Sequence, residues 1–259
     1  MGASSTMPYA ELVATLRSAG CVFAEDEARV LTEAARDDAE LAAMLARRVA
    51  GEPLELVVGF AAFCGLRIAV APGVFVPRQR SAALVRAAAA GLSSGEVAVD
   101  LCCGTGALGA ALLAAVPGLE VYAADVDPDA VACARRNLPA ERVFLGDLYS
   151  ALPDGLRGRV CVLVVNAPYV PTDDIALMPP EARDHEHRVA LDGGTDGLDV
   201  QRGVVAGATD WLAPGGRLLI ETSAAQSSRT AGLMTAAGLA AEVVRDEDVD
   251  GTVVVGTLR

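Results

Sequence analysis

The chain has 259 residues, of which 53% are hydrophobic. That length and apolar content suffice for one full-size α/β domain with a small extra unit, and they exclude a largely disordered chain. The 34 acidic residues outnumber 21 basic ones, all of them arginine, and the formal net charge of −13 disfavours a nucleic-acid-binding protein, which normally presents a basic face to phosphates.

Helical spacing of apolar residues dominates the first part of the chain. Residues 8–50 carry apolar side chains at helical intervals, with Gly20 and Gly51 as stop signals. The segment 57–73 is rich in β-branched residues and glycine, which predicts a hairpin, and an Ala-rich helix is expected at 82–91. We therefore predict three parts: a small helical unit at 1–52, a β-hairpin linker at 53–76 and the main domain at 77–259.

From residue 97 onward, short β-branched runs alternate with helical patterns. The expected strands are 97–103, 120–126, 142–148, 160–166, 216–223, 241–245 and 252–259, and the expected helices are 106–116, 128–138, 197–212 and 225–237. A long loop is expected between Pro168 and Gly194. The alternation predicts an α/β, Rossmann-like fold with a seven-stranded, mostly parallel sheet and helices on both faces. In such sheets ligands bind at the carboxyl ends of the strands, where several of these loops converge.

The turn after the strand at 97–103 reads D-L-C-C-G-T-G-A-L-G, from Asp100 to Gly109. Gly104 and Gly106 allow the backbone to turn sharply and to approach a ligand closely. The spacing also matches the G-x-G-x-x-G motif of dinucleotide-binding proteins. However, Asp100 stands one turn before the loop, where a carboxylate repels a pyrophosphate and favours a cationic sulfonium.

Acidic residues also end the next two strands. Asp125 can accept the ribose hydroxyls and Asp147 can meet an adenine edge, so three acids at successive strand ends suit S-adenosyl-L-methionine better than NAD. The alternative is that Asp125, Asp127 and Asp129 only cap the following helix, a role that Pro128 favours for Asp129. The residues that we expect to bind the cofactor are Asp100, Cys102, Gly104, Thr105, Gly106, Asp125, Val126, Asp147, Leu148 and Asn166.

The strand at 160–166 ends in N-A-P-Y, from Asn166 to Tyr169. Taken alone, this stretch is explained equally well as a plain turn and as part of a pocket that binds a planar, hydrogen-bonding group. It resembles the Asn-Pro-Pro-Tyr loop of methyltransferases that act on planar amide or amino nitrogens.

Further stretches narrow this resemblance. G-E-P-L at 51–54, F-V-P-R at 75–78, A-L-D-G-G-T-D-G-L-D-V-Q-R at 190–202 and G-G-R-L-L-I-E-T-S-A-A-Q at 215–226 resemble the protein-(glutamine-N5) methyltransferase family, and especially a shorter related subgroup. The likeness runs in order over about residues 40–259. It implies a class I methyltransferase fold, S-adenosyl-L-methionine as donor with S-adenosyl-L-homocysteine as product, and the glutamine of the Gly-Gly-Gln tip of a peptide-chain release factor as acceptor.

The chemistry of amide methylation accounts for the residue types in this loop. The Asn166 side-chain oxygen and the Ala167 carbonyl can accept the two N–H groups of an amide, so that the nitrogen lone pair is aimed at the methyl group. Tyr169 can pack flat against the amide, and no metal is needed because the sulfonium is already activated. The expected catalytic residues are Asn166, Ala167, Pro168 and Tyr169, and the expected substrate contacts are Pro77, Arg78, Asn166, Tyr169 and Glu186.

Some positions depart from the family pattern. Ala167 stands where the family's loop has its first proline, and His187 stands where the family often has a proline. The family's P-R-P-E-T-E stretch is P-R-Q-R-S-A at 77–82, so a carboxylate near the entrance of the cofactor and substrate site is absent. Three further possibilities therefore stay open. The first is an enzyme that methylates an amide or amino nitrogen of a small metabolite. The second is a methyltransferase that acts on amino groups of nucleic acids, which the net charge disfavours. The third is a regulatory protein that binds the cofactor without catalysis. The oligomeric state cannot be predicted from the sequence.

The remaining features predict no further site. His185 and His187 form an H-x-H pair without a third ligand and are expected to face solvent. Cys102 and Cys103 have no histidine nearby in the sequence and are expected to pack as small side chains. Six cysteines without a C-x-x-C pair and a start without a secretory signal indicate the cytoplasm. No apolar run approaches the roughly 18 residues of a membrane span.

Overall fold

The computed structural model describes residues 7–259, and the chain divides into two compact units between Phe60 and Ala61. This boundary lies inside the segment predicted as a linker. The first six residues of the predicted helical unit lie outside the described residues. No helix within residues 7–259 is long and apolar enough to cross a membrane.

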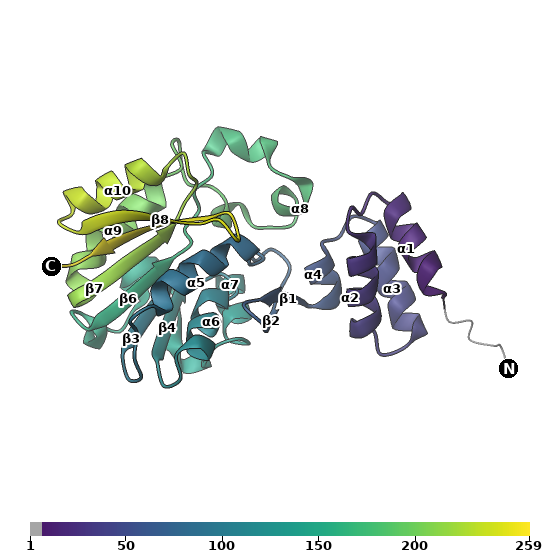
Figure 1. Cartoon of the computed structure of the whole chain (residues 1–259), viewed down its shortest axis with the longest axis horizontal. Helices are drawn as coiled ribbons and strands as arrows, with labels where there is room; N and C mark the ends of the chain where they lie inside the picture. The colour runs from purple at the N-terminus through teal and green to yellow at the C-terminus, as the bar shows by residue number, and fades with distance from the viewer. Residues whose placement is uncertain (1–6) are drawn as a thin grey trace. The chain divides into compact units, whose positions relative to one another are not determined.

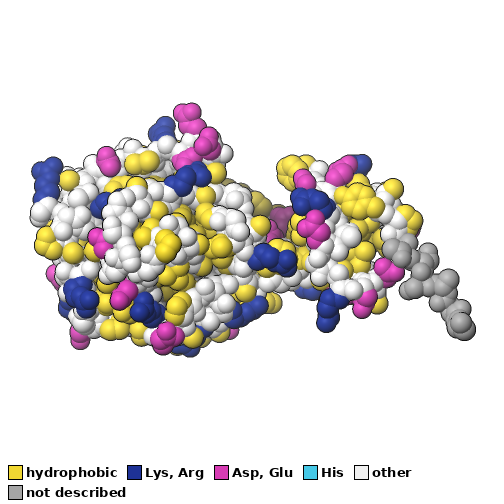
Figure 2. Space-filling view, turned by 60° about the horizontal axis from the view of Figure 1, so that its bottom comes forward, with side chains coloured by type: hydrophobic (Ala, Val, Ile, Leu, Met, Phe, Trp, Pro, Cys, Tyr) yellow, Lys and Arg dark blue, Asp and Glu magenta, His cyan; other side chains and the backbone are white. Residues whose placement is uncertain are grey.

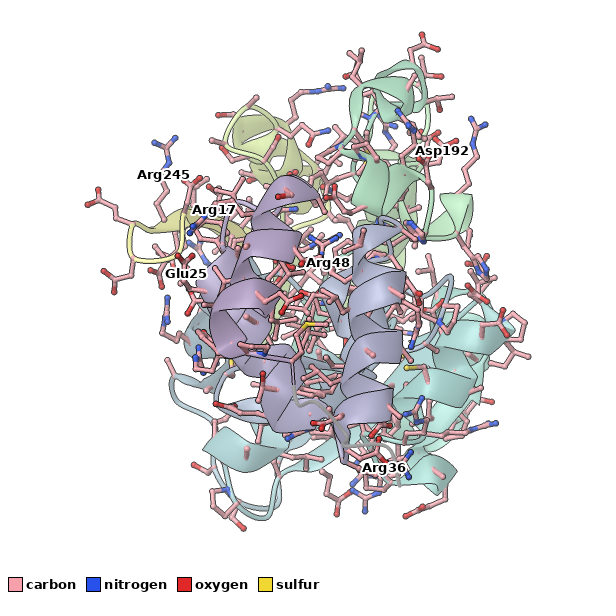
Figure 3. All side chains as sticks on the ribbon, turned by 90° about the vertical axis from the view of Figure 1, so that its right-hand side faces the viewer. Arg17, Glu25, Arg36, Arg48, Asp192 and Arg245 are labelled. Atoms are coloured by element: carbon pink, nitrogen blue, oxygen red, sulfur yellow. The ribbon has the colours of Figure 1, made fainter. Side chains whose placement is uncertain are left out.

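Unit 1 is a small helical bundle. Its helices are α1 (Tyr9–Ser18), α2 (Ala24–Ala34), α3 (Asp38–Val49) and α4 (Leu54–Val58). Leu12, Leu16, Leu31 and Leu45 form much of its core. Ion pairs join its helices: Arg48 lies 2.6 Å from Glu27 in a nearly buried contact, and Arg17 of α1 pairs with Glu25 of α2, as Figure 3 shows.

Helix α4 corrects the sequence analysis, which placed these residues in or before a hairpin. Pro53 precedes the helix and Gly59 closes it in the left-handed conformation, with φ of 81°. These two punctuating residues outweigh the strand preference of Val57 and Val58. The hairpin follows directly, as β1 (Phe60–Phe63) and β2 (Leu66–Ala69).

Unit 2 is built on a seven-stranded sheet with the order β5-β4-β3-β6-β7-β9-β8. All strand pairs are parallel except the two that β9 makes with β7 and β8. The mostly parallel α/β sheet that the sequence predicted is therefore confirmed. The strands are β3 (Val97–Leu101), β4 (Glu120–Asp125), β5 (Val143–Leu145), β6 (Val160–Val165), β7 (Leu212–Glu221), β8 (Ala240–Asp246) and β9 (Gly251–Thr257).

Helices cover both faces of this sheet (Figure 1). One apolar cluster joins one face to α5 (Ala82–Ala89), α6 (Ala107–Ala115) and α7 (Pro128–Ala134), and a second joins the other face to α9 (Asp199–Trp211) and α10 (Ser227–Ala236). Burial on both faces explains why the central strands read as continuous apolar runs.

The chain order of the strands fixes where a ligand binds. From β3 the chain moves outward through β4 to β5, and then returns to the other side of β3 with β6 and β7. The direction of the sheet order therefore reverses between β3 and β6, and the crevice at the carboxyl ends of these two strands is the place where such folds bind ligands.

Several element boundaries differ from the predicted ones. The expected long loop at 168–194 contains a one-turn helix, α8 (Pro180–Arg183), and short 3-10 turns. Strand β5 has three residues and ends before Gly146, which has φ of 157°. The predicted cap of α7 is wrong by two residues, because the side chain of Asp127 accepts the N–H of Asp129 and is the N-cap.

Candidate functional site

A pocket opens at the carboxyl ends of β3, β4, β5 and β6, beside the segment that leads into α5. Its lining combines a glycine loop (residues 102–106), an acceptor loop (residues 166–169) and parts of later loops. The residues that line it are Phe63, Val74, Phe75, Pro77, Arg80, Ser81, Cys102, Cys103, Gly104, Thr105, Ala107, Leu108, Ala124, Asp125, Val126, Asp127, Ala130, Asp147, Leu148, Asn166, Ala167, Pro168, Tyr169, Val170, Met178, Val189, Ala190, Leu191 and Val200.

Left-handed backbone shapes the glycine loop. Cys102, Gly104 and Gly106 have φ of 55°, 54° and 75°. A Cβ on Gly104 would meet only Phe75, at 4.0 Å, so the backbone there faces open space in the pocket. A Cβ on Gly109 would lie 3.0 Å from Val121, so this last glycine serves the close packing of α6 on the sheet.

Asp100 lies behind the glycine loop and does not line the pocket. It is completely buried, and its Oδ2 accepts the N–H of Gly109 at 2.9 Å. Burial raises the pKa of the Asp100 carboxyl to about 8. The structure thus places this acid where it fixes the start of α6, and Gly106 likewise lies outside the lining.

Asp125 ties the glycine loop to the turn after β4. One oxygen accepts the N–H of Gly104 at 2.8 Å and the other accepts the N–H of Asp127 at 2.9 Å. Burial raises the pKa of Asp125. Its carboxylate remains part of the lining together with that of Asp147, which is exposed. The structure therefore brings the predicted acids of β4 and β5 to one end of the pocket.

The two cysteines of the glycine loop are not activated. Burial raises the pKa of both the Cys102 and the Cys103 thiols, and the neighbouring aspartates raise it further. A thiol must lose its proton to act as a nucleophile, so these side chains are poorly suited to that role. Their packing beside the loop accords with the sequence-based interpretation.

The acceptor loop presents two hydrogen-bond acceptors to the pocket. The Asn166 side-chain nitrogen donates to the Ser81 hydroxyl at 3.3 Å, which leaves its Oδ1 turned away from that bond. The carbonyl oxygen of Ala167 accepts no hydrogen bond from any described residue. Both residues line the pocket. Two oxygens of the lining residues, Asn166 Oδ1 and Ala167 O, are therefore available to accept from an N–H-bearing group.

Ser81 links Asn166 to a buried acid. Ser81 and Glu221 are each 2% exposed. Burial raises the pKa of Glu221, while the Ser81 hydroxyl, as a hydrogen-bond donor, and the guanidinium of Arg80 counteract it. A hydroxyl has one hydrogen, and when that hydrogen goes to Glu221, the Ser81 oxygen must accept from Asn166. This sequence of bonds fixes which end of the Asn166 amide points to Ser81 and which end points away from it.

Tyr169 is held from two sides. Its hydroxyl accepts from Nη2 of Arg80 at 2.7 Å, and its carbonyl accepts from Nε2 of Gln226 at 3.0 Å. A Cβ on Gly197 would lie 2.3 Å from this carbonyl, and one on Gly193 would lie 2.8 Å from the carbonyl of Pro168. The glycines of the D-G-G-T-D-G stretch are therefore required by the close approach of two backbones.

Two predicted substrate contacts lie outside the lining. Glu186 is buried, and its Oε1 accepts from Nη2 of Arg78 at 2.6 Å and from the N–H of Val76 at 3.2 Å. The structure therefore places Arg78 and Glu186 as a tie between the segment before α5 and the loop after β6. Of the predicted substrate contacts on these segments, Pro77 does line the pocket.

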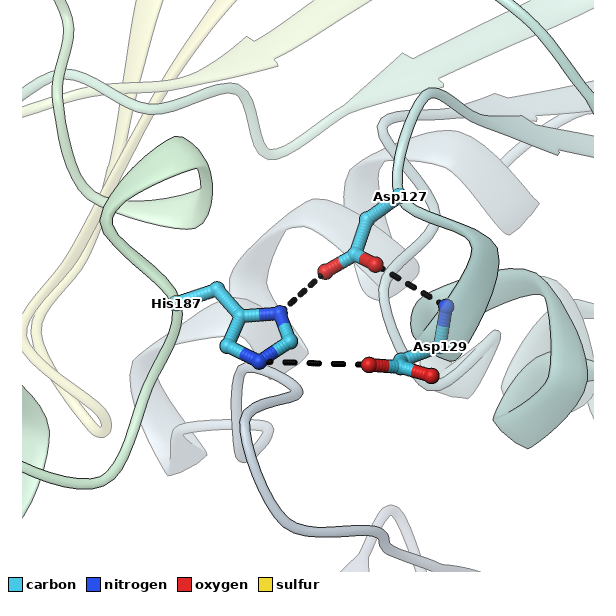
Figure 4. A group of neighbouring side chains, drawn as sticks. All are labelled: Asp127, Asp129 and His187. Carbon is cyan, nitrogen blue, oxygen red and sulfur yellow. Dashed lines mark hydrogen bonds and ion pairs between the residues drawn. The ribbon is translucent and has the colours of Figure 1, made fainter.

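His187 extends this tie, as Figure 4 shows. Its Nδ1 lies 2.7 Å from Oδ2 of Asp127, its Nε2 lies 3.9 Å from Asp129, and a Cβ on Gly73 would collide with its ring. These three ligand-bearing side chains lie close enough to hold a metal ion, and His185 is not part of the group. However, both oxygens of Asp127 already have partners, in the helix cap and in His187, so the group is explained as a link between the loop and α7.

Sequence reasoning missed Arg80 and Ser81 as pocket residues. Both lie in the P-R-Q-R-S-A stretch, which it had singled out only for a missing carboxylate. The partners of Arg80 are 89 and 141 residues away in the sequence. The signal that was present is the basic residue at a position where the resembling family carries an acid.

Known proteins resemble this chain in both sequence and fold. A model of the Methyltransferase small domain family matches residues 65–177. A release factor glutamine methyltransferase of Geobacter sulfurreducens is 37% identical over 208 residues, which cover 77% of this chain and 72% of that protein. A 4-amino-L-phenylalanine/4-methylamino-L-phenylalanine methyltransferase of Streptomyces pristinaespiralis is 36% identical over 201 residues, which cover 74% of this chain and 68% of that protein.

A solved structure supports the fold. The crystal structure of a methyltransferase from Pyrococcus furiosus matches with a TM-score of 0.56 at 19% identity, over 74% of this chain and 89% of that one. At this level of identity the match concerns the arrangement of strands and helices alone.

Proposed function

The chain belongs to the family of release factor glutamine methyltransferases, and from this premise we propose that it methylates the side-chain amide nitrogen of a glutamine in a protein, such as a peptide-chain release factor. It is a methyltransferase, and its methyl donor is S-adenosylmethionine. The observation that carries the proposal is that Asn166 and Ala167 line the pocket while Asn166 Oδ1 and Ala167 O accept no hydrogen bond from any described residue.

The residues present fit this donor. S-adenosylmethionine supplies a methyl group on a positively charged sulfur. The acids Asp125 and Asp147 lie at one end of the pocket, and the Gly104 backbone faces open space there. Each carboxylate oxygen has more than one lone pair, so Asp125 can accept ribose hydroxyls while it holds its two backbone N–H groups. We assign Asp125, Asp147 and the glycine loop to donor binding, and Asp100 to positioning that loop from behind.

The acceptor loop orients the nitrogen that is methylated. An amide nitrogen is a poor nucleophile because its lone pair is delocalised into the carbonyl. When its two hydrogens point at Asn166 Oδ1 and Ala167 O, the lone pair points out of that plane, and Tyr169 limits its tilt from one side. Such positioning can supply about 7–11 kcal/mol in model reactions. The proton left on the product can pass to water, so no strong base is required of the chain.

A second candidate acceptor is the amino nitrogen of a small molecule. The Streptomyces pristinaespiralis relative is named for an amino acid that carries an amino group on its ring, and it matches this chain nearly as well as the release factor enzyme does. The two acceptors share the need for a pair of N–H acceptors. The two acceptors differ in the chemical groups that surround the nitrogen. The P-R-Q-R-S-A stretch, in which this chain departs from the family pattern, contributes Arg80 and Ser81 to the pocket lining and can contact those groups.

A nucleic-acid acceptor and a non-catalytic role receive less support. Figure 2 shows basic side chains scattered singly among acidic ones on the face in view, without a continuous basic patch. This pattern and the net charge of −13 disfavour methylation of a nucleic acid. A non-catalytic role is disfavoured because the acceptor loop keeps its Asn, its backbone carbonyl and its Tyr in the lining. The cytoplasmic location stays a prediction.

Methyl transfer from labelled S-adenosylmethionine tests the proposal. The acceptors are a release factor, a Gly-Gly-Gln peptide and a Gly-Gly-Asn peptide that shortens the side chain by one methylene. We expect label in the first two only. Asn166→Ala should lower kcat by about 100-fold, as the loss of a positioned polar group in other enzymes does, with little change in donor affinity.

Asp125→Ala is the control variant to Asn166→Ala, because Asp125 is assigned to donor binding. It should weaken donor binding, measured by calorimetry, more than it lowers kcat at saturating donor. If label from the donor enters only small molecules of a cell lysate, the proposal of a protein glutamine fails and the second candidate acceptor is supported. Wild-type kcat in Asn166→Ala would contradict the assigned role of the loop.

A further inference from the structure

The charged side chains of the pocket are divided between its two ends. Asp125, Asp127 and Asp147 lie at the ends of β4 and β5 and just beyond. Arg80 is the one cationic side chain among the described residues that line the pocket, and it contacts Tyr169 of the acceptor loop. The acceptor loop therefore has a guanidinium beside it, whereas the cationic side chain is absent from the end formed by Asp125, Asp127 and Asp147 among the described lining residues.

The guanidinium of Arg80 is held by two hydrogen bonds and retains further N–H groups that can bind a ligand. Its Nε donates to Glu221 at 3.3 Å and its Nη2 donates to the Tyr169 hydroxyl at 2.7 Å. Its Nη1 has no hydrogen-bond partner among residues 7–259, and the side chain is 46% exposed. Nη1 and the second N–H of Nη2 form an edge that matches the two oxygens of a carboxylate.

Arg80 also lies next to the machinery that orients the nitrogen. Ser81, its neighbour in sequence, accepts from the Asn166 amide, and Glu221 contacts both Arg80 and Ser81. A ligand group bound by Arg80 therefore lies on the same side of the pocket as the acceptor loop.

We propose that Arg80 selects methyl acceptors that carry a carboxylate able to reach its guanidinium while the nitrogen that is methylated lies at the acceptor loop. The inference rests on the proposed function and narrows its substrate class. Two sources supply this chemistry: an acidic side chain beside the glutamine in a peptide, or the terminal carboxylate of a peptide or free amino acid. Both present two oxygens to the same edge of the guanidinium.

A purely structural role for Arg80 makes a different prediction. If the side chain only steadied Tyr169 and Glu221, its removal would slow methylation of every acceptor by the same factor. Selection by charge changes the ratio between a carboxylate-bearing acceptor and its uncharged isostere. This ratio is therefore the decisive measurement.

The experiment compares matched acceptors in the full-length enzyme. One pair of peptides places Asp or Asn next to the glutamine, and a second pair ends in glutamine with a free carboxylate or a carboxamide. Free L-glutamine and a free amino acid with a ring amino group, each with its carboxamide form, complete the set. Wild-type kcat/KM should be roughly 10- to 100-fold higher for the charged member of at least one peptide pair, as a charge-assisted hydrogen bond implies. The pair that shows the preference identifies the source of the carboxylate.

Variants of Arg80 assign this preference. Arg80→Gln, which keeps donors but removes the charge, should bring the ratio close to one, and Arg80→Lys should retain part of it. Donor affinity, measured by calorimetry, should stay at the wild-type value in both variants, which also shows that they are folded. Equal kcat/KM for both members of each pair in the wild type would overturn the inference and leave the proposed function intact.

The remaining outcomes separate the two claims. If no glutamine acceptor reacts while a free amino acid with a ring amino group does, and Arg80→Gln abolishes its preference over the carboxamide form, the glutamine proposal fails and the Arg80 inference stands. A ratio that Arg80→Gln leaves unchanged would overturn the inference even where wild type prefers the charged acceptor. Absence of transfer to every acceptor would overturn both.

Discussion

Substitution of Ser81 by alanine probes the orientation of the Asn166 amide. In the structure Asn166 Nδ2 donates to the Ser81 hydroxyl at 3.3 Å, and this bond decides that Oδ1 points away from Ser81. Without the hydroxyl, an amide rotated end for end would present its N–H groups to the acceptor nitrogen. Such an orientation cannot accept a hydrogen from the substrate, so it is unproductive.

The expected loss has two limits. At the lower limit the two amide orientations become equally populated, which halves the productive fraction and lowers kcat about 2-fold. At the upper limit the whole net free energy of the hydrogen bond, at most about 1.5 kcal/mol, is lost from the transition state, which corresponds to about 10-fold. Donor affinity should be unchanged, because Ser81 contacts the acceptor loop rather than the acids at the donor end.

The assay is single-turnover methylation of the best acceptor at saturating donor. Ser81→Thr is the matched control, since it keeps the hydroxyl that Asn166 needs and should retain kcat within about 2-fold, although its extra buried methyl can lower stability by about 1 kcal/mol or more. A wild-type kcat in Ser81→Ala would refute the reasoning. So would an equal loss in the alanine and threonine variants, because the hydroxyl would then be irrelevant.

Asp125→Asn should raise the dissociation constant of the donor, measured by calorimetry, because an amide replaces one of the two oxygens that accept backbone N–H groups from the loops around the donor site. Gly197→Ala should lower the melting temperature and kcat together, since φ is +74° and the added Cβ would lie 2.3 Å from the carbonyl of Tyr169, whereas Gly232→Ala, which meets nothing within 4 Å, should be neutral or slightly stabilising. The folded-state pKa of Asp100 is raised to about 8 from 3.8, so the folded chain holds a proton that the unfolded chain releases, and the free energy of unfolding should fall as pH rises from about 4 to about 8. Asp100→Asn should remove this part of the slope, measured by denaturant titration at both ends of that range, and an unchanged slope would contradict the assignment to this residue.

The parts of the fold that could be predicted are those encoded locally. Alternating β-branched runs and helical patterns sufficed for the sheet, and the carboxyl-end rule was enough to bring Asp125, Asp147 and Asn166 to one crevice. The same rule does not say which way a side chain points. Asp125 is the last residue of β4, but Asp100 lies one residue before the end of β3 and pairs with Ala123. It therefore lies deeper under the glycine loop and accepts the N–H of Gly109 near the start of α6.

The contacts that shape the acceptor end could not be predicted because they join distant segments. Arg80 reaches Glu221 across 141 residues and Tyr169 across 89, and a local pattern contains no information on such pairs. A charge at an unexpected position was visible in the sequence, but its meaning depended on knowing what lies opposite. Short helix α4 was missed for the converse reason, since Pro53 and Gly59 are local signals that a run of β-branched residues obscured.

The stretches that resemble the family and those that depart from it serve different purposes in the structure. Gly193, Gly197 and Gln226 lie within resembling stretches, and they hold the backbone of the acceptor loop without lining the pocket. Arg80 and Ser81, by contrast, lie in the stretch that departs, and they line the pocket beside the nitrogen. The residues that hold the acceptor loop are compatible with any methyl acceptor that has a planar N–H-bearing group, because the proposed contacts of the Asn166 and Ala167 oxygens involve only the N–H hydrogens. What distinguishes one such acceptor from another must then be recognised by the neighbouring side chains, and under the inference drawn above this is the role of Arg80 beside Tyr169.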